Sequence, residues 1–306
     1  MVRAVAETTG SDPKAIHVSF FGISDVGRVR KNNEDNFVVC NLTTGEVGLS
    51  PTLREHTLGQ YGSLFMVADG MGGEASGEVA SQLAAVTIPK RLYDNLKSLG
   101  VVSEANFVIL LREAIEYANQ IIFQKAQSHP DYRGMGTTTT AAALFGQYLF
   151  VGQVGDSRAY LDRNQQMTQL TRDQTFFNYL KDIGAELPAD PEKDSRKSIL
   201  TQAVGSSETL DVKVTSTKVL QGDRLLLCSD GLYNMVPEPE LLETVSRANG
   251  LADKCKALIE KANGYGGTDN ITMIMAEFSG EGLPPMDATT SVECKEFNEE
   301  DFKPRP

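Results

Sequence analysis

The sequence predicts an α+β fold with mainly antiparallel sheets. Short apolar runs, broken by glycine and asparagine, fill most of the chain and indicate strands. Two pairs of helical segments interrupt them, one after residue 75 and one after residue 236. Strands and helices that are segregated in this way favour antiparallel sheets over a doubly wound sheet, so the helices should cover the outer faces of the sheets.

The first part of the chain predicts a loose arm and then three strands. Residues 1–15 are small and polar, so they should form a flexible arm. Apolar runs predict strands over 17–25, 36–42 and 63–69, and the third leads into the glycine-dense turn GMGG. Residues 43–62 are rich in Gly, Thr and Pro, which indicates a hairpin tip or a loop.

A pair of helices should follow this turn. The first is expected over about 76–97, and Pro89 should kink or interrupt it. Val79, Leu83 and Val86 share one face of this helix.

The second helix of the pair should begin after Ser103, which suits an N-cap. Residues 137–145 and 148–156 then predict a β-hairpin, because β-branched and aromatic residues flank a short turn. Residues 171–200 are polar and predict an irregular surface excursion with one short helical piece. The other apolar runs predict, in order, strands 157–162, 166–170, 214–220 and 223–230, helices 237–248 and 252–264, and strand 270–278.

The composition changes after Ser279. Residues 280–306 carry seven acidic and three basic residues and few apolar ones, which predicts a disordered acidic tail. We therefore expect an arm, one domain over 16–279 and a tail.

Composition narrows the classes of function. The formal net charge of −12 argues against a general nucleic-acid binder, which normally carries a basic face. The N-terminus lacks the apolar core of a signal peptide, and no window is apolar enough to span a membrane. The four cysteines are scattered, as is typical of reduced and mostly buried thiols. A cytoplasmic protein with no membrane or nucleic-acid partner is expected.

Acidic residues fall at the ends of predicted strands. SLFMVADG and RLLLCSDG share one pattern, an apolar run and then Asp-Gly, which places Asp69 and Asp230 where a buried strand leaves the core. Asp156 also follows an apolar strand. Two further acidic sites come just before strands, at Glu34-Asp35 and Asp269.

Five such sites together favour a shared metal site, although one Asp at a strand end is commonly only a turn former. Clustered carboxylates repel each other, and removing them from water is costly unless a cation lies between them. Oxygen ligands select hard cations such as Mg²⁺ or Mn²⁺. Two such ions can clamp a phosphate and ionise a bridging water for in-line attack.

Arg30 lies four residues before Glu34. A guanidinium beside a metal cluster suits phosphate oxygens, through bidentate hydrogen bonds. It would equally suit a solvated basic patch with Arg28 and Lys31, and spacing alone leaves both readings open.

The ordered motifs resemble the PP2C-type (PPM) protein phosphatases, in their compact bacterial form. The segments that carry the resemblance cover roughly residues 17–278, and they are SDVGRVRKNNEDNF, VADGMGGEASGE, GMGTTTTAAAL, VGQVGDSRAYL, LTRDQ, LLLCSDGLYNMV and GGTDNITMIM. The resemblance implies a β-sandwich of two mainly antiparallel sheets flanked by pairs of helices. It also implies a metal-dependent phosphatase that acts on phosphoserine and phosphothreonine, opposed by a Ser/Thr kinase, and we expect a monomer.

The resemblance assigns ligands for two Mn²⁺ or Mg²⁺ ions in the cleft between the sheet edges. By position, Asp69 should bridge the two ions. The Gly70 carbonyl and Glu34 should bind one ion, and Asp230 and Asp269 should bind the other.

Further roles follow from the same resemblance. Asp35 should hold metal-bound waters, and Asp156 together with Asp230 should bind a weaker third ion. Arg30 should bind the substrate phosphate, and Asn270 should order the loop around the metal ligand. Residues 172–199 fall where the family has its flap, next to the active site.

One position departs from part of the family. Some members carry a histidine just after the Asp-Gly, proposed as the general acid, and here that position is Met71. His17, His56 and His129 have no motif support. We therefore hypothesise that a metal-bound water protonates the leaving group.

Three other functions make different demands on the sequence. A non-catalytic relative that had lost its metals should lack one or more of the strand-end acids, and all are present. A calcium-binding scaffold should carry a D-x-[DN]-x-[DN]-G loop, and the sequence has none. A small-molecule phosphatase on the same fold stays open from the sequence.

Overall fold

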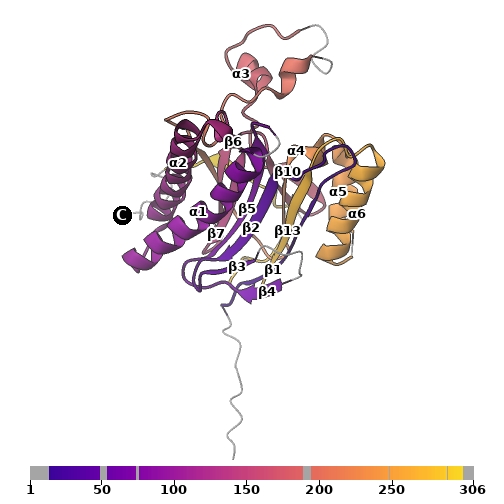
Figure 1. Ribbon diagram of the computed structural model, residues 1–306. Helices are drawn as coiled ribbons and strands as arrows, with labels where there is room; N and C mark the ends of the chain where they lie inside the picture. The colour runs from indigo at the N-terminus through magenta and orange to yellow at the C-terminus, as the bar shows by residue number, and fades with distance from the viewer. Residues whose placement is uncertain are drawn as a thin grey trace, which may run out of the picture.

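The computed structural model describes residues 14–48, 54–73, 76–188, 194–247, 249–287 and 289–298. The arm predicted over 1–15 therefore lies outside the described residues, except for Lys14 and Ala15. Figure 1 shows two sheets packed face to face, with helices on both outer sides.

The described strands form two antiparallel sheets, as predicted. The six-stranded sheet has the order β10 (Gln166–Gln169), β9 (Arg158–Arg163), β12 (Arg224–Cys228), β13 (Ile271–Ser279), β1 (His17–Asp25) and β4 (Arg54–Thr57). The eight-stranded sheet has the order β14 (Lys295–Glu296), β11 (Lys213–Lys218), β8 (Tyr148–Val154), β7 (Thr139–Phe145), β5 (Ser63–Met71), β2 (Asp35–Asn41) and β3 (Glu46–Gly48), and β6 (Gly136–Thr137) pairs with β5 off this path.

Two helical pairs cover the outer faces of these sheets (Figure 1). On the eight-stranded sheet lie α1 (Ser76–Leu99) and α2 (Glu104–Ser128), and on the six-stranded sheet lie α5 (Glu238–Ser246) and α6 (Leu251–Gly264). The short helices are α3 (Phe176–Asp182), α4 (Asp230–Tyr233) and the 3₁₀ turns Pro130–Tyr132 and Ser195–Ser198.

Three apolar layers hold this arrangement together. The central layer joins the inner faces of the two sheets, with Phe65 of β5 packed edge-to-face on Phe20 of β1 and Phe278 of β13. A second layer fills the space between the eight-stranded sheet and its helices, and a third lies between the six-stranded sheet and α5 and α6. Burial of these apolar faces is the main driving force for the sandwich.

The buried face of α1 differs from the predicted one. Val86 is 57% exposed, and Val79 and Leu83 are only partly buried. The residues that face the sheet recur every four positions, and they are Ala80, Ala84, Ile88, Leu92 and Leu96. The prediction followed the bulkier side chains, whereas small alanines allow the helix to approach the sheet closely.

Of the two outcomes expected at Pro89, a kink or an interruption, the interruption does not occur. Pro89 is buried inside α1, which runs continuously from Ser76 to Leu99. The start of α2 agrees with the prediction, because Ser103 is its N-cap and its side chain accepts a hydrogen bond from the Asn106 N–H.

We call residues 172–199 the flap. Its described part includes α3, which projects from the sandwich at the top of Figure 1. Its helix α3 begins at the N-cap Thr175. The two ends of the flap are joined at its root, where Phe176 N–H donates to the Ile199 carbonyl at 2.8 Å and Thr201 N–H donates to the Gln174 carbonyl at 2.8 Å.

The C-terminal segment differs from the disordered tail predicted from residue 280. Leu283 is 2% exposed and packs between the sheets, and Lys295–Glu296 form β14 against β11. Arg163 donates to the Ser291 carbonyl at 3.0 Å. The described part of this segment is therefore bound to the domain, because its few apolar residues find burial sites that composition alone does not reveal.

Candidate metal centre and active site

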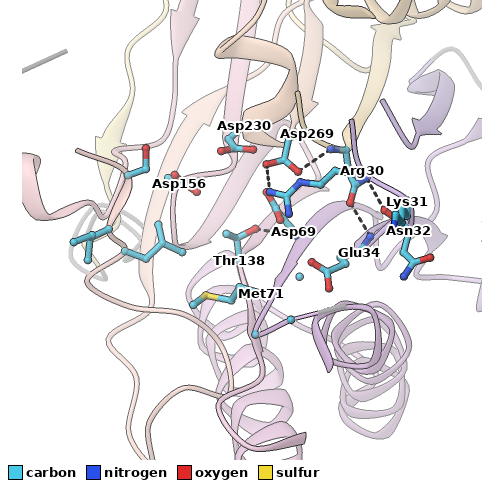
Figure 2. Close-up of a pocket in the computed structure, with 17 residues that line it drawn as sticks. Arg30, Lys31, Asn32, Glu34, Asp69, Met71, Thr138, Asp156, Asp230 and Asp269 are labelled. Carbon is cyan, nitrogen blue, oxygen red and sulfur yellow. Dashed lines mark hydrogen bonds and ion pairs between the residues drawn. The ribbon is translucent and has the colours of Figure 1, made fainter. Parts of the chain in front are cut away.

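A cavity of about 620 Å³ opens at one end of the two sheets. Figure 2 shows Asp69, Asp230 and Asp269 gathered at its centre, with Asp156 on one side and Lys31 and Asn32 on the other. The cavity is lined by Arg30, Lys31, Asn32, Glu34, Asp69, Gly70, Met71, Gly72, Gly73, Thr138, Asp156, Ser198, Ile199, Leu200, Asp230, Asp269 and Asn270.

The acids meet because antiparallel pairing places the end of one strand beside the start of the next. Asp69 at the end of β5 pairs with Asp35 at the start of β2. In the other sheet, Asp230 follows β12 and Asp269 precedes its neighbour β13, which runs antiparallel to it. Of the strand-end acids, Glu34, Asp69, Asp156, Asp230 and Asp269 line one cavity, and Asp35 does not.

Asp69 is held through its backbone, which leaves its carboxylate directed at the cavity. Its N–H donates to Thr138 Oγ1 at 3.0 Å, and its carbonyl accepts from the Thr138 N–H at 2.8 Å. Thr137 Oγ1 donates to the same carbonyl at 2.9 Å. Thr138 could not be predicted from the sequence, because it lies in a run of four threonines with no pattern to single it out.

Gly70 is required by a close approach of three backbone segments. A Cβ at this position would lie 2.2 Å from the Gly77 carbonyl oxygen and 2.6 Å from the Glu34 carbonyl oxygen. Gly70 N–H also donates to the Glu34 carbonyl at 3.2 Å. The Asp-Gly turn, the start of α1 and the loop that carries Glu34 can come together only because residue 70 has no side chain.

Asp35 lies behind the cavity and does not line it. Its carboxylate is buried and accepts a hydrogen bond from Ser229 Oγ at 2.7 Å. Ser229 N–H in turn donates to the Thr272 carbonyl, so Asp35 sits at the junction of the two sheets.

Burial and repulsion between neighbouring carboxylates raise the pKa of four carboxyls at or behind this cavity, those of Asp35, Asp69, Asp156 and Asp230. Burial is the largest cause in every case. It raises the pKa of Asp35 to about 7, that of Asp230 to about 6 and that of Asp156 to about 7, and neighbouring aspartates add to each shift. The pKa of Asp69 is raised well above its usual range by burial and then by Asp35 and Asp230.

A cation at this site would offset the burial of these carboxylates and the repulsion between them. Ionised carboxylates that are removed from water and placed near each other need positive charge between them. Within the described part of the chain, no group of three His, Cys, Asp or Glu side chains is arranged to hold a metal ion, and Asp269 is instead turned towards Arg30. The all-oxygen donor set and the excess of negative charge nevertheless fit hard divalent cations such as Mn²⁺ or Mg²⁺.

Arg30 stands at the mouth of the cavity. Its Nη2 donates to Asp269 Oδ2 at 2.8 Å, and its side chain is 51% exposed. This bond and the charge of Asp269 raise the pKa of Arg30. The guanidinium therefore stays charged and close to the carboxylates while it remains open to solvent.

Asn270 fixes the loop that carries Arg30 and Glu34. Its Oδ1 accepts from the Glu34 N–H at 2.8 Å, and its Nδ2 donates to the carbonyls of Val26 and Asn32 at 3.0 and 2.9 Å. Asn270 therefore ties the start of β13 to both ends of this loop.

Among the described residues, no histidine lines the cavity. His56 Nε2 contacts Ser63 Oγ at 2.6 Å, His17 lies on β1 and His129 caps the end of α2. Met71 lines the cavity and cannot donate a proton.

No described helix is both long and apolar enough to cross a membrane.

Comparison with known proteins gives a consistent result. The family model described as Protein phosphatase 2C matches residues 54–263. The chain is 36% identical over 255 residues to "Serine/threonine phosphatase stp" of Listeria monocytogenes serovar 1/2a, a match that covers 83% of this chain and 93% of that protein.

Two solved structures show the same fold. The crystal structure of the Mycobacterium tuberculosis serine/threonine phosphatase PstP/Ppp superposes with a TM-score of 0.69 at 33% identity, covering 85% of this chain and 98% of that chain. The catalytic domain of PstP in complex with 2 manganese ions superposes with a TM-score of 0.68 at 32% identity, covering 86% and 99%. The chain therefore belongs to the protein phosphatase 2C family of metal-dependent serine/threonine phosphatases.

Proposed function

We propose that this chain hydrolyses phosphoserine and phosphothreonine in protein substrates at the acidic cavity. The single observation that supports this most strongly is the convergence of acids from separate strand ends on one cavity that has Arg30 at its mouth. In this proposal, two Mn²⁺ or Mg²⁺ ions are held by Glu34, Asp69, the Gly70 carbonyl, Asp230 and Asp269. Bound there, such ions neutralise phosphate charge and lower the pKa of water.

The protein residues orient the substrate around this centre. Arg30 is placed to form bidentate hydrogen bonds to phosphate oxygens, and its exposure allows it to leave Asp269 when a phosphate enters. Asp269 is then available as a ligand. Arg30 is therefore expected to contribute mainly to substrate binding.

We also propose that Asp156 and Asp230 share a weaker third ion, because both line the same cavity and the charge of Asp230 raises the pKa of Asp156. Asp35 is proposed to orient ligand waters from behind Asp69, since Ser229 fixes its carboxylate.

We also propose an opposing kinase, a cellular location and an oligomeric state for the enzyme. A phosphoprotein phosphatase implies a Ser/Thr kinase that supplies its substrates. Four free cysteines, three of them buried, suit a reducing compartment and support a cytoplasmic location. We propose a monomer as the working form.

The test compares substrates under Mn²⁺. Phosphothreonine peptides should be hydrolysed with higher kcat/KM than nucleotides or sugar phosphates, and EDTA should abolish the reaction. Full activity in EDTA would contradict the metal centre, whereas a preference for sugar phosphates would favour a small-molecule phosphatase.

A further inference from the structure

Arg158 lies just beyond Asp156 at the start of β9, and it does not line the metal cavity. It nevertheless connects three parts of the molecule that meet around that cavity. Its Nε donates to Asp173 Oδ1 at 3.0 Å and its Nη2 donates to Asp173 Oδ2 at 2.6 Å. Its Nη1 donates to the phenol oxygen of Tyr160 at 3.0 Å.

The second connection is to α4, the turn that begins with Asp230. The guanidinium of Arg158 lies over the ring of Tyr233, 3.6 Å from its centroid. The hydroxyl of Tyr233 donates to the main-chain carbonyl of Asp156 at 3.1 Å. Tyr233 therefore links the backbone at Asp156 to the helical turn of Asp230, and Arg158 holds the ring in place.

The third connection is to the root of the flap. Asp173 precedes Gln174, whose N–H donates to the Gly155 carbonyl at 3.0 Å and whose Oε1 accepts from the Gly155 N–H at 2.9 Å. Asn178 of α3 donates to the Asp173 carbonyl at 2.9 Å. Gly155, the residue before Asp156, is thus bonded to the flap root through both its main-chain N–H and its carbonyl.

We propose that Arg158, Asp173 and Tyr233 form one positioning unit, which fixes Asp156 relative to Asp230 and couples both acids to the flap root. A planar, bidentate and stacked arginine suits this task, because it holds an acid and an aromatic ring in one fixed geometry. Only the predicted effect on metal use rests on the proposed role of Asp156 and Asp230 as metal ligands. The mechanical coupling itself is a property of the protein without metal.

The experiment uses two conservative variants and a matched control. Tyr233→Phe removes the hydroxyl that holds the Asp156 carbonyl but keeps the ring under Arg158. Asp173→Asn keeps the shape of the side chain and removes the charge that anchors Arg158. Asp182→Asn is the control, because Asp182 is an aspartate of the same flap, ion-paired with the exposed Arg172 and not bonded to the unit.

The first readout is amide hydrogen exchange in the metal-free proteins. Both variants should speed exchange at Gly155 and Gln174 by roughly threefold or more, and the control should leave it unchanged. Unchanged exchange in both variants, or equal changes in the control, would overturn the proposal. This readout does not depend on phosphatase activity, so it distinguishes failure of the unit from failure of the proposed function.

The second readout is Mn²⁺ activation with a phosphothreonine peptide. Each variant should need several-fold more Mn²⁺ for half-maximal activity, with kcat at saturating Mn²⁺ changed less than about twofold. The double variant should be no worse than the worse single variant, because the residues act together. Fully additive effects, or a loss of kcat without a shift in Mn²⁺ requirement, would contradict a positioning unit.

Discussion

At the scale of single residues, the proposed metal centre consists of carboxylates whose backbones are fixed by hydrogen bonds and whose charges repel each other. Asp69 shows both properties, with Thr137 and Thr138 bonded to its backbone and with burial raising its pKa. Its position was readable from the sequence, since Asp-Gly after a buried strand is a local pattern. Thr138 was not, because its role depends on which strand lies beside β5.

Asp69→Asn should remove metal-dependent hydrolysis by two or more orders of magnitude, because it removes the ligand proposed to bridge both ions. In EDTA, the same variant should be at least as stable as the wild type, because it removes a buried charge that is repelled by Asp35 and Asp230. Phosphopeptide turnover and thermal unfolding with EDTA measure the two effects. A metal-free variant that unfolds well below the wild type would contradict this account of the site.

Arg30→Ala should raise KM for a phosphopeptide roughly tenfold or more, since a charge-assisted hydrogen bond contributes about 1.5–3 kcal/mol. The value of kcat should fall much less. Arg30→Lys, which keeps the charge but loses the planar fork, should recover only part of the loss. An unchanged KM in Arg30→Ala would show that Arg30 is only a solvated charge.

The histidines give a further prediction at this scale. Replacing His17, His56 or His129 singly by Asn should leave turnover of both an alkyl and an aryl phosphate nearly unchanged, because none of the three lines the cavity. If one variant lost only the alkyl phosphate, that histidine would be the general acid. Our hypothesis about the source of the proton would then fail.

At the scale of elements, the strands and the helical pairs followed from periodicity, and the exceptions have identifiable causes. The buried face of α1 was predicted wrongly because the spacing of small alanines is a weaker signal of burial than the spacing of Val and Leu. Within the segment 43–62 the structure has β3 and β4, which are three and four residues long and belong to different sheets. Such short edge strands are defined by their partners and not by their own sequence.

The flap offers a prediction about substrate size. Ile199 lines the metal cavity and is 51% exposed, whereas Ile183 in the same flap is 58% exposed and does not line it. Ile199→Ser should raise KM for phosphopeptides several-fold and leave p-nitrophenyl phosphate hydrolysis unchanged, because only a peptide is long enough to contact this side chain. Ile183→Ser is the matched control, and equal effects of the two changes would rule out a local contact.

At the scale of the whole molecule, we expect metal binding and stability to be coupled through pH. The folded-state pKa values of Asp35, Asp156 and Asp230 lie above the usual value of about 3.9 for an unfolded chain. The folded state therefore binds more protons between about pH 4 and pH 7. Without metal, stability should fall as pH rises through this window, since the carboxyls then ionise against each other.

Thermal unfolding in EDTA should accordingly give a lower Tm at about pH 8 than at about pH 5.5, and saturating Mn²⁺ should reverse the trend, because cations favour the ionised carboxylates. An Asp69→Asn, Asp230→Asn double variant is the control and should show a flatter profile in EDTA. A wild-type Tm in EDTA that rises over this range would contradict the assigned pKa directions.

The short strand β14 has a consequence for how this molecule behaves in a crowded solution. It ends the eight-stranded sheet with only two residues, paired to Thr215 and Ser216 of β11. Bare sheet edges are templates on which other chains aggregate. A chain cut after residue 293 keeps Leu283 and Val292 but leaves β11 uncovered, so it should self-associate in light scattering where the full chain does not. The C-terminal segment would in that case protect the edge of the sheet from aggregation.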